Sequence, residues 1–204
     1  MKPLEKNRKR VLGPYHKFYI DGGFRKEEAG WRDMTADLGT GRVSGANVPT
    51  WSAFRNGIYA YSFAKGDEVW ITFHPNHDVQ VGAKFYPHVH WSTTGTGTGD
   101  VVWGFEYTIA EGHDTDEFPT TNTVYATTTV STGVAYRHHI AEVADGSAIT
   151  MPDVDSLIMF RIFRYNDASD TFTGDVFGLT ADIHYRADRF ATKGKRPDFD
   201  EEDA

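Results

Sequence analysis

The sequence predicts an all-β protein, an eight-stranded β-sandwich of the jelly-roll type with an extended N-terminal arm. Aromatic residues make up 14% of its 204 residues, and Thr, Gly and Val are abundant, a composition that favours strands and turns over helices. From residue 58 onwards, short apolar-rich segments alternate with turn sequences, and no long helical pattern lies between them. Such spacing is typical of a sandwich or barrel, and eight strands in two sheets is the jelly-roll number.

The chain divides into three predicted segments. Residues 1–48 lack strong periodicity and contain several Gly clusters, so we expect an extended arm with little regular structure that lies on another surface. Residues 49–190 hold the jelly-roll sandwich, and residues 191–204 form a charged C-terminal tail. At the start of the sandwich, VPTWSAFRNG predicts a short helix with Thr50 as its N-cap.

The strands follow one another with turn signals between them. IYAYSF alternates, and Gly66 and Asp67 make a turn into EVWITFH. Polar stretches, TTGTGTGD and EGHDTDEFP, then separate the later segments. The eight predicted strands cover residues 58–63, 68–74, 83–91, 101–110, 121–130, 135–143, 156–165 and 175–188.

Alternation within each strand predicts which side chains face the core. In VVWGFEYTI, Trp103 and Phe105 share one face, which we expect to be buried. In LTADIHYRAD, Ile183 faces inwards, whereas Asp182 and His184 face outwards. These assignments depend only on the two-residue period of a strand, so they hold for any strand order.

The stretch GAKFYPHVHW raises the question of a metal site. His88 and His90 share one strand face with Tyr86, and the other face carries Val89 and Trp91, which we expect in the core. The spacing matches the opening Gly-x5-His-x-His of the cupin pattern, but no Glu follows within a few residues and no later segment completes the motif. Cupin ligands also point into the barrel. We therefore expect no metal, no cofactor and no catalytic residues, and a purified protein without a stoichiometric transition metal.

Charge and composition exclude several classes. The net charge of −8 argues against a general nucleic-acid binder. The absence of cysteine excludes disulfides, thiol catalysis and thiolate metal sites. No apolar run approaches the roughly 18–20 residues of a membrane span, and none of signal-peptide length follows the basic start. We expect a soluble protein made in the cytoplasm.

Several motifs, taken in order, resemble a family of tailed-bacteriophage proteins. They are TWSAFRNGIYAYSF, YPHVHW, VVWGFEYTIA, FPTTNTVYA, LIMFRIFRY and TADIHYRADR, and together they span roughly residues 50–190. The resemblance implies a virion structural protein encoded among head and neck genes, a jelly-roll capsid decoration, or cement, protein on the capsid surface. Its implied partner is the major capsid protein, and it implies no catalytic residues.

The segment SLIMFRIFRY predicts association with a partner. Its outward face carries Leu157, Met159 and Phe163, interrupted by Arg161, although a sandwich buries only one face of a strand against its own core. The arm, a second copy or the capsid must cover the other face. We therefore expect a dimer or trimer, or an obligate place on a capsid lattice.

Two other functions stay open. A tail- or neck-associated sandwich that binds carbohydrate or a receptor would use exposed aromatic rings, and Trp31, Trp51 and Trp70 are the candidates for sugar stacking. A cupin-like metal-dependent enzyme would use His88 and His90.

Overall fold

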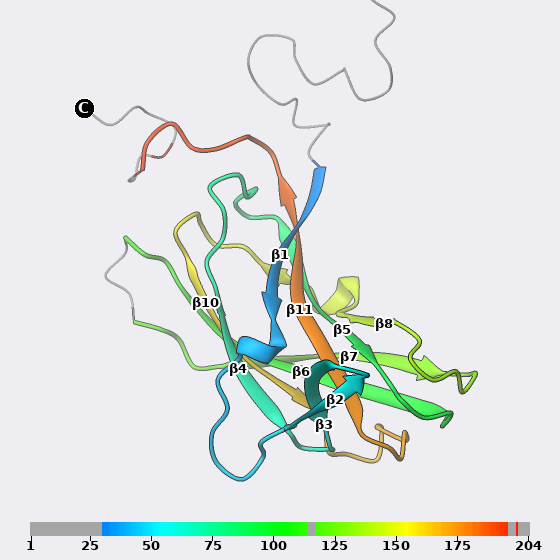
Figure 1. The fold of residues 1–204 in the computed structure, drawn as a ribbon. Coiled ribbons are helices and arrows are strands. Elements are labelled where there is room, and N and C mark those ends of the chain that lie inside the picture. Colours follow the sequence, from blue (N-terminus) through cyan, green and yellow to red (C-terminus); the bar gives the residue numbers. More distant parts are fainter. Residues whose placement is uncertain (1–29, 114–116, 196–198, 200–204) are drawn as a thin grey trace, which may run out of the picture.

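A computed structural model describes residues 30–113, 117–195 and 199 of the chain. Two antiparallel sheets pack face to face (Figure 1). The first sheet contains β2 (Thr50–Arg55), β3 (Ile58–Phe63), β11 (Val176–Ala187), β5 (Lys84–Ser92) and β8 (His139–Glu142) in that order, with β1 (Gly30–Asp37) also paired to β11 and β9 (Ile149–Thr150) to β5. The second sheet has the order β4 (Glu68–Phe73), β10 (Leu157–Arg164), β6 (Gly99–Ala110) and β7 (Asn122–Val130).

This strand order confirms the predicted jelly roll. The chain passes from one sheet to the other between β3 and β4, β4 and β5, and β5 and β6, and again along β7, β8, β10 and β11. Only β6 and β7 are consecutive neighbours within one sheet of this eight-strand set, where they form the central hairpin. All eight predicted strands are present, and β1, β2 and β9 extend the first sheet. Among the described residues, no helix is long and apolar enough to cross a membrane.

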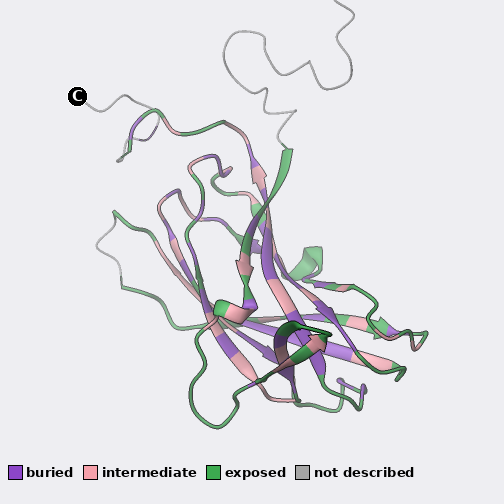
Figure 2. Cartoon of the chain, viewed as in Figure 1, coloured by how far each residue is buried: buried purple, intermediate pink, exposed green. Residues whose placement is uncertain are grey.

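The core lies between the sheets and is built from the predicted inward faces. Val89 and Trp91 of β5, Trp103 and Phe105 of β6 and Ile183 of β11 are all buried in one hydrophobic cluster. Figure 2 shows buried residues running along the central strands, with exposed residues on the loops. The two-residue alternation therefore assigned the buried face of each of these strands correctly.

The predicted helix at residues 48–57 is wrong, because this stretch begins a β-hairpin. β2 and β3 are antiparallel neighbours joined at Asn56 and Gly57. Asn56 has φ 52°, the left-handed backbone that a tight two-residue hairpin turn requires and that Asn and Gly adopt most readily. The Asn-Gly pair is a hairpin signal, which outweighs the helix-cap pattern of Thr50.

The predicted arm is shorter than expected where the structure describes it. Residues 30–37, assigned to an arm with little regular structure, form β1, which pairs along β11 (Figure 1). Residues 1–29 lie outside the described residues. In the predicted tail, Phe199 is buried against the core and its backbone carbonyl accepts from the amides of Lys193 and Gly194. A predicted tail residue therefore packs on the domain.

The outward face of β10 is partly covered by the chain itself. Phe163 is buried, with its ring near those of Tyr125 and Tyr165. Its ring also lies over Gly104 of β6, where any Cβ would overlap it. Met159 lies on the same outer face, four residues before Phe163 in β10, and remains exposed. One of the three apolar side chains assigned to a partner is thus covered internally.

Candidate functional site

The outer face of the first sheet collects histidines and carboxylates from four strands. Directly opposed residues in a sheet share a face, and Asp182 of β11 lies opposite His88 of β5, which lies opposite Glu142 of β8. Asp33 of β1 lies opposite His184 of β11 in the same way. The prediction that His88 and His90 lie on the outer face is therefore confirmed, and they have neighbours that the sequence did not reveal.

His88 occupies the centre of this cluster and is buried, with 1% of its surface exposed. Its Nε2 lies 3.6 Å from Oδ2 of Asp182, and its Nδ1 lies 3.3 Å from the backbone carbonyl of Tyr86. The ring of His184 lies beside it, with the centroids 4.1 Å apart. A histidine on the outer face of a sheet is buried here because the neighbouring strands surround it with side chains.

His90 is the second histidine of the motif and lies closer to solvent. Its Nε2 is 3.1 Å from Oδ2 of Asp182, and its Nδ1 is 2.6 Å from Nε2 of His138. His138 and His139 point to opposite faces, because the His138 ring stacks on His90 and the His139 ring stacks on the buried Trp91. The oxygen Oδ2 of Asp182 therefore faces both imidazoles of the His-x-His pair.

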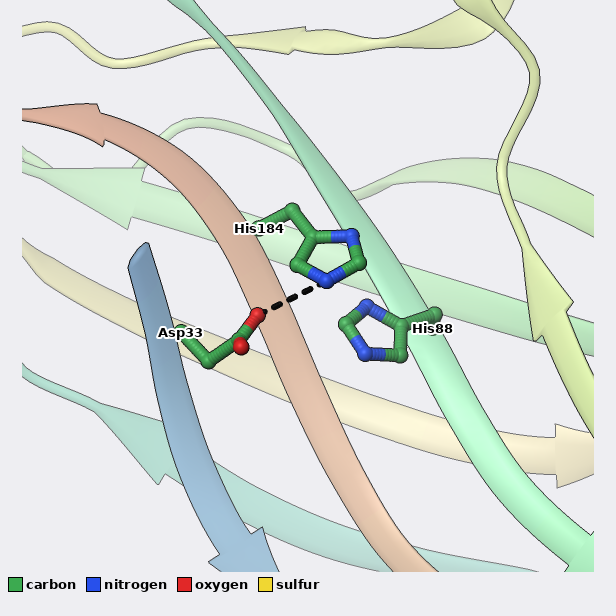
Figure 3. Close-up of side chains that lie close together, drawn as sticks. All are labelled: Asp33, His88 and His184. Atoms are coloured by element: carbon green, nitrogen blue, oxygen red, sulfur yellow. Dashed lines mark ion pairs between the residues drawn. The ribbon is translucent and has the colours of Figure 1, made fainter. Parts of the chain in front are cut away.

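The other half of the cluster is an ion-pair group around His184. Nε2 of His184 lies 2.8 Å from Oδ1 of Asp33 (Figure 3). Its Nδ1 contacts Oε2 of Glu142, which also lies 3.9 Å from Nδ1 of His88. Both ring nitrogens of His184 are thus occupied by carboxylates. Figure 3 also shows the His88 ring next to this pair but not joined to it by an ion pair.

The surroundings shift the two motif histidines in opposite directions. Burial opposes protonation of His88, but the Asp182 carboxylate and the Tyr86 carbonyl favour the charged ring and raise its pKa above the usual value. Burial lowers the pKa of His90, and the attraction of Asp182 does not offset it. The pKa of one histidine of the motif is therefore raised and that of the other is lowered.

Asp182 is the least satisfied charged group of the cluster. It is 8% exposed, and its Oδ1 is buried without a hydrogen-bond partner in the described part of the chain. A buried carboxylate oxygen that has lost water without gaining a partner carries a desolvation cost of about 1–3 kcal/mol. Two groups of potential metal ligands overlap at His88. In each group, one ligand atom per residue lies within 4.8 Å of the others; the groups are His88, His90 and Asp182, and Asp33, His88 and His184.

The sequence argument against a metal considered only residues that follow His90 along the chain, and the structure brings further candidate ligands to it from other strands. The ligand types missing from the sequence after His90 are supplied by β11, β8 and β1. Sequence alternation identified Asp182 and His184 as outward-facing, but the pairing of β11 with β5 was not readable from it. The cupin comparison fails on geometry, because the histidines lie outside the sandwich while Val89 and Trp91 lie inside.

The three tryptophans considered for sugar stacking lie in different settings. Trp31 of β1 and Trp51 of β2 are exposed, whereas Trp70 of β4 is half-buried. Trp70 lines an open groove of about 900 Å³ on the outer face of the second sheet. Its other lining side chains include Thr72, Glu106, Thr108, Met159 and Arg161.

A second group of histidines gathers at the loop residue Asp155. His77 and His113 contact its carboxylate at 2.6 and 3.0 Å, and His74 lies 3.6 Å away. Burial opposes ionisation of Asp155, but the hydrogen bonds from His113 and His77 outweigh it and lower its pKa. Both oxygens of this carboxylate have partners.

Comparison with known proteins gives only remote likenesses. No family model and no curated relative matches the chain. Similar solved structures include the CBM22-1–GH10 modules of xylanase 10B from Clostridium thermocellum in complex with xylohexaose (16% identity, 76% of this chain, 26% of that chain, TM-score 0.37). Others are dimeric latent PorU from Porphyromonas gingivalis (10%, 78%, 13%, 0.35) and CBM28, a carbohydrate-binding module specific for non-crystalline cellulose (11%, 73%, 95%, 0.29). The chain thus spans about a quarter or less of the first two proteins, and at these TM-scores the likenesses carry no functional argument.

Proposed function

We propose that this chain is a bacteriophage virion structural protein that decorates the capsid and binds neighbouring capsid subunits. The motifs that resemble the phage family fall on the strands of the jelly roll: YPHVHW lies on β5, WGFEY on β6 and ADIHYRA on β11. The family resemblance therefore rests on the core of the fold rather than on variable loops. Binding, rather than catalysis, is the activity proposed.

The observation that carries the proposal is the exposed apolar hairpin of β2 and β3. It presents Trp51, Ile58 and Tyr59, which are 53%, 65% and 52% exposed. The Trp51 and Tyr59 rings are stacked, with centroids 6.4 Å apart, so they form a preorganised aromatic surface. Aromatic side chains are enriched at protein interfaces, where each removes a large apolar area from water.

The test is binding to capsids that lack this protein. Labelled wild-type protein is co-sedimented with such capsids, beside a variant carrying Trp51→Ser and Tyr59→Ser. We expect the hairpin variant to bind at least about tenfold more weakly, the scale of losing one interface hot spot. The matched control is Val81→Ser, which removes an exposed apolar side chain outside both the hairpin and the β10 face and should bind like the wild type.

The result would contradict the proposal in two cases. Wild-type protein that does not bind the capsids, or binds purified tails instead, excludes a decoration role. Binding that the hairpin variant retains in full excludes the hairpin as the contact. Light scattering on the free protein tests the expected dimer or trimer independently.

A second candidate is carbohydrate binding in the groove beside Trp70. Sugars are recognised by an aromatic ring together with hydrogen-bonding side chains, and this groove combines Trp70 with Glu106, Arg161 and four threonines. Titration calorimetry against bacterial surface polysaccharides is the test. Trp70→Ala should abolish binding while the hairpin variant retains it, and no binding by the wild type would exclude this function.

A further inference from the structure

We propose that His88, His90 and Asp182 form a binding site for a divalent transition-metal ion of the Zn²⁺ class on the outer face of the first sheet. This inference goes beyond the proposed function and replaces the sequence-based expectation of no metal. The three residues come from the two central strands of the sheet, β5 and β11, where backbone positions are set by the pairing of Asp182 with His88.

Two of the three donor–donor distances lie close to those around a tetrahedral ion, and the third pair of donors lies within 4.8 Å. Ligand atoms about 2.0–2.2 Å from a tetrahedral metal lie about 3.3–3.6 Å from each other. Oδ2 of Asp182 lies 3.6 Å from Nε2 of His88 and 3.1 Å from Nε2 of His90. The first distance is too long for a hydrogen bond but suits two ligands of one ion.

The outer contacts of both imidazoles leave Nε2 available for the metal. Nδ1 of His88 faces the Tyr86 carbonyl, so the proton on Nδ1 is donated there. Nδ1 of His90 faces Nε2 of His138, which accepts the second proton. Metal-bound histidines nearly always donate their other N–H to such a partner, because this fixes the tautomer and the ring orientation.

The buried Asp182 carboxylate is a second observation that points to a cation, because only its Oδ2 has partners, the two imidazoles, and its Oδ1 has none among the described residues. Buried polar atoms in folded proteins almost always have partners, and an exception needs an explanation such as an ion. Asp182 is more than nine-tenths buried, and its Oδ1 has no hydrogen bond from the described residues. A bound cation would compensate this carboxylate, and mixed imidazole and carboxylate ligands suit Zn²⁺.

The neighbouring group of Asp33, His88 and His184 is the weaker choice for the ion. Asp33 already occupies one ring nitrogen of His184 (Figure 3), and Glu142 occupies the other. A metal there would have to break the Asp33–His184 ion pair. His88 can serve only one ion through Nε2. With His90 and Asp182, that ion would replace only the contacts of the two imidazoles with Oδ2 of Asp182, since all three side chains would become its ligands.

The test uses the full-length chain without a tag, stripped with EDTA and titrated with ZnCl₂ by calorimetry. We expect one Zn²⁺ per chain. Because an ion that binds only the folded state stabilises it, the melting temperature should rise by roughly 5–10 °C at free Zn²⁺ about 100 times Kd. Co²⁺ provides a second readout through its visible absorption.

Variants place the ion on the proposed ligands. His90→Gln and Asp182→Asn should each weaken Zn²⁺ binding by more than about 100-fold, since even outer-shell changes cost about 10–100-fold. His138→Ala should weaken it by about tenfold. His184→Gln tests the neighbouring group, and His113→Gln, in the Asp155 group, is the matched control; both should retain binding. Circular dichroism checks that each variant is folded.

Two results would overturn the inference. The first is a wild-type chain that binds neither Zn²⁺, Co²⁺ nor Ni²⁺ stoichiometrically, or that binds them equally after His90→Gln and Asp182→Asn. The second is loss of binding in His184→Gln with retention in His90→Gln, which would place the ion on Asp33, His88 and His184 instead.

Discussion

Each outer face of the sandwich carries a cluster of charged side chains over a central strand. The two clusters differ in how many of their carboxylate oxygens have a hydrogen-bond or ion-pair partner. On the second sheet, Arg161 of β10 donates to Glu106 at 2.5 Å and to Glu68. The second oxygens of these glutamates accept from Thr121 and Asn47. All four carboxylate oxygens on this face therefore have a donor.

On the first sheet, the central carboxylate is more buried and less satisfied. Asp182 faces two imidazoles with one oxygen and leaves the other without a partner among the described residues. A fully paired cluster holds the strands together and leaves no carboxylate oxygen free for a metal ion. An incompletely paired cluster has an oxygen that a bound cation could compensate. Whether each atom has a partner, more than the number of charges, therefore separates a structural cluster from a candidate metal site.

We expect the largest loss of unfolding free energy when one member of the buried Arg164–Asp170 ion pair is removed. Arg164 is buried and pairs with the buried Asp170, and it also donates to the carbonyls of Phe63, Phe172 and Gly174. Arg164→Met should destabilise the protein by about 3–5 kcal/mol, because the three carbonyls lose their donor and the buried Asp170 keeps only Lys65, 3.3 Å away, and the Val102 amide as partners. Urea unfolding measures this loss. A loss below about 1 kcal/mol would show that an incompletely paired buried carboxylate destabilises this fold very little. The unpartnered oxygen of Asp182 would then give no indication of a bound cation.

The next effect concerns the satisfied face. Arg161→Met leaves two glutamates without their common cation and should cost about 1.5–3 kcal/mol at neutral pH. Arg161→Lys, which keeps a charge but loses the two-sided donor geometry, should cost less. A loss equal to that of an exposed control such as Arg137→Met would mean that this cluster contributes nothing.

The same face makes a prediction about pH. Hydrogen bonds from Thr121 and Arg161 lower the pKa of Glu106, so its contribution to stability is full above the unfolded value of about 4.3 and is lost as pH falls through the folded value. The difference between wild type and Arg161→Met should therefore shrink below about pH 4. Unfolding free energies measured from pH 3 to 7 test this, and a constant difference would contradict it.

Packing on the second face provides a further contrast that involves no charge. Gly104 lies under the Phe163 ring, where a Cβ would overlap it. Gly104→Ala should cost about 1–3 kcal/mol through overpacking. Combining it with Phe163→Leu should recover part of the loss, and simple additivity of the two losses would show that the ring does not lie over this position.

The smallest effect is expected at Asp182 in the absence of metal. Asp182→Asn keeps an acceptor towards the imidazoles and removes a buried charge with an unpartnered oxygen, so in EDTA the stability should change by at most about 1 kcal/mol. Urea midpoints with and without EDTA give the measurement. A loss as large as that of Arg161→Met would mean that the Asp182 carboxylate already has effective partners without metal. The two outer faces would then not differ in how completely their carboxylates are paired.

Sequence patterns predicted the eight jelly-roll strands and missed features that depend on competing local signals. Thr50 matched the pattern of a helix N-cap, yet the stretch forms a β-hairpin of β2 and β3 with its turn at Asn56 and Gly57. Residues 30–37 looked unstructured because their weak alternation gave no strand signal, and they form β1 only because β11 offers an edge to pair with. Propensity is a weak prior, and tertiary pairing overrides it.

Alternation along the sequence is enough to predict on which side of a strand each residue lies. Val89 and Trp91 face the core and His88 and His90 face outwards because successive side chains alternate, a property that needs no knowledge of the partner strand. Only the tertiary structure decided which strands are neighbours. The jelly-roll order sets β11 beside β5 and so places Asp182 against His88, far apart in the sequence, and the surrounding strands remove both side chains from water. Hydrogen bonding between strands acts at any separation along the chain, so this juxtaposition has no local signature.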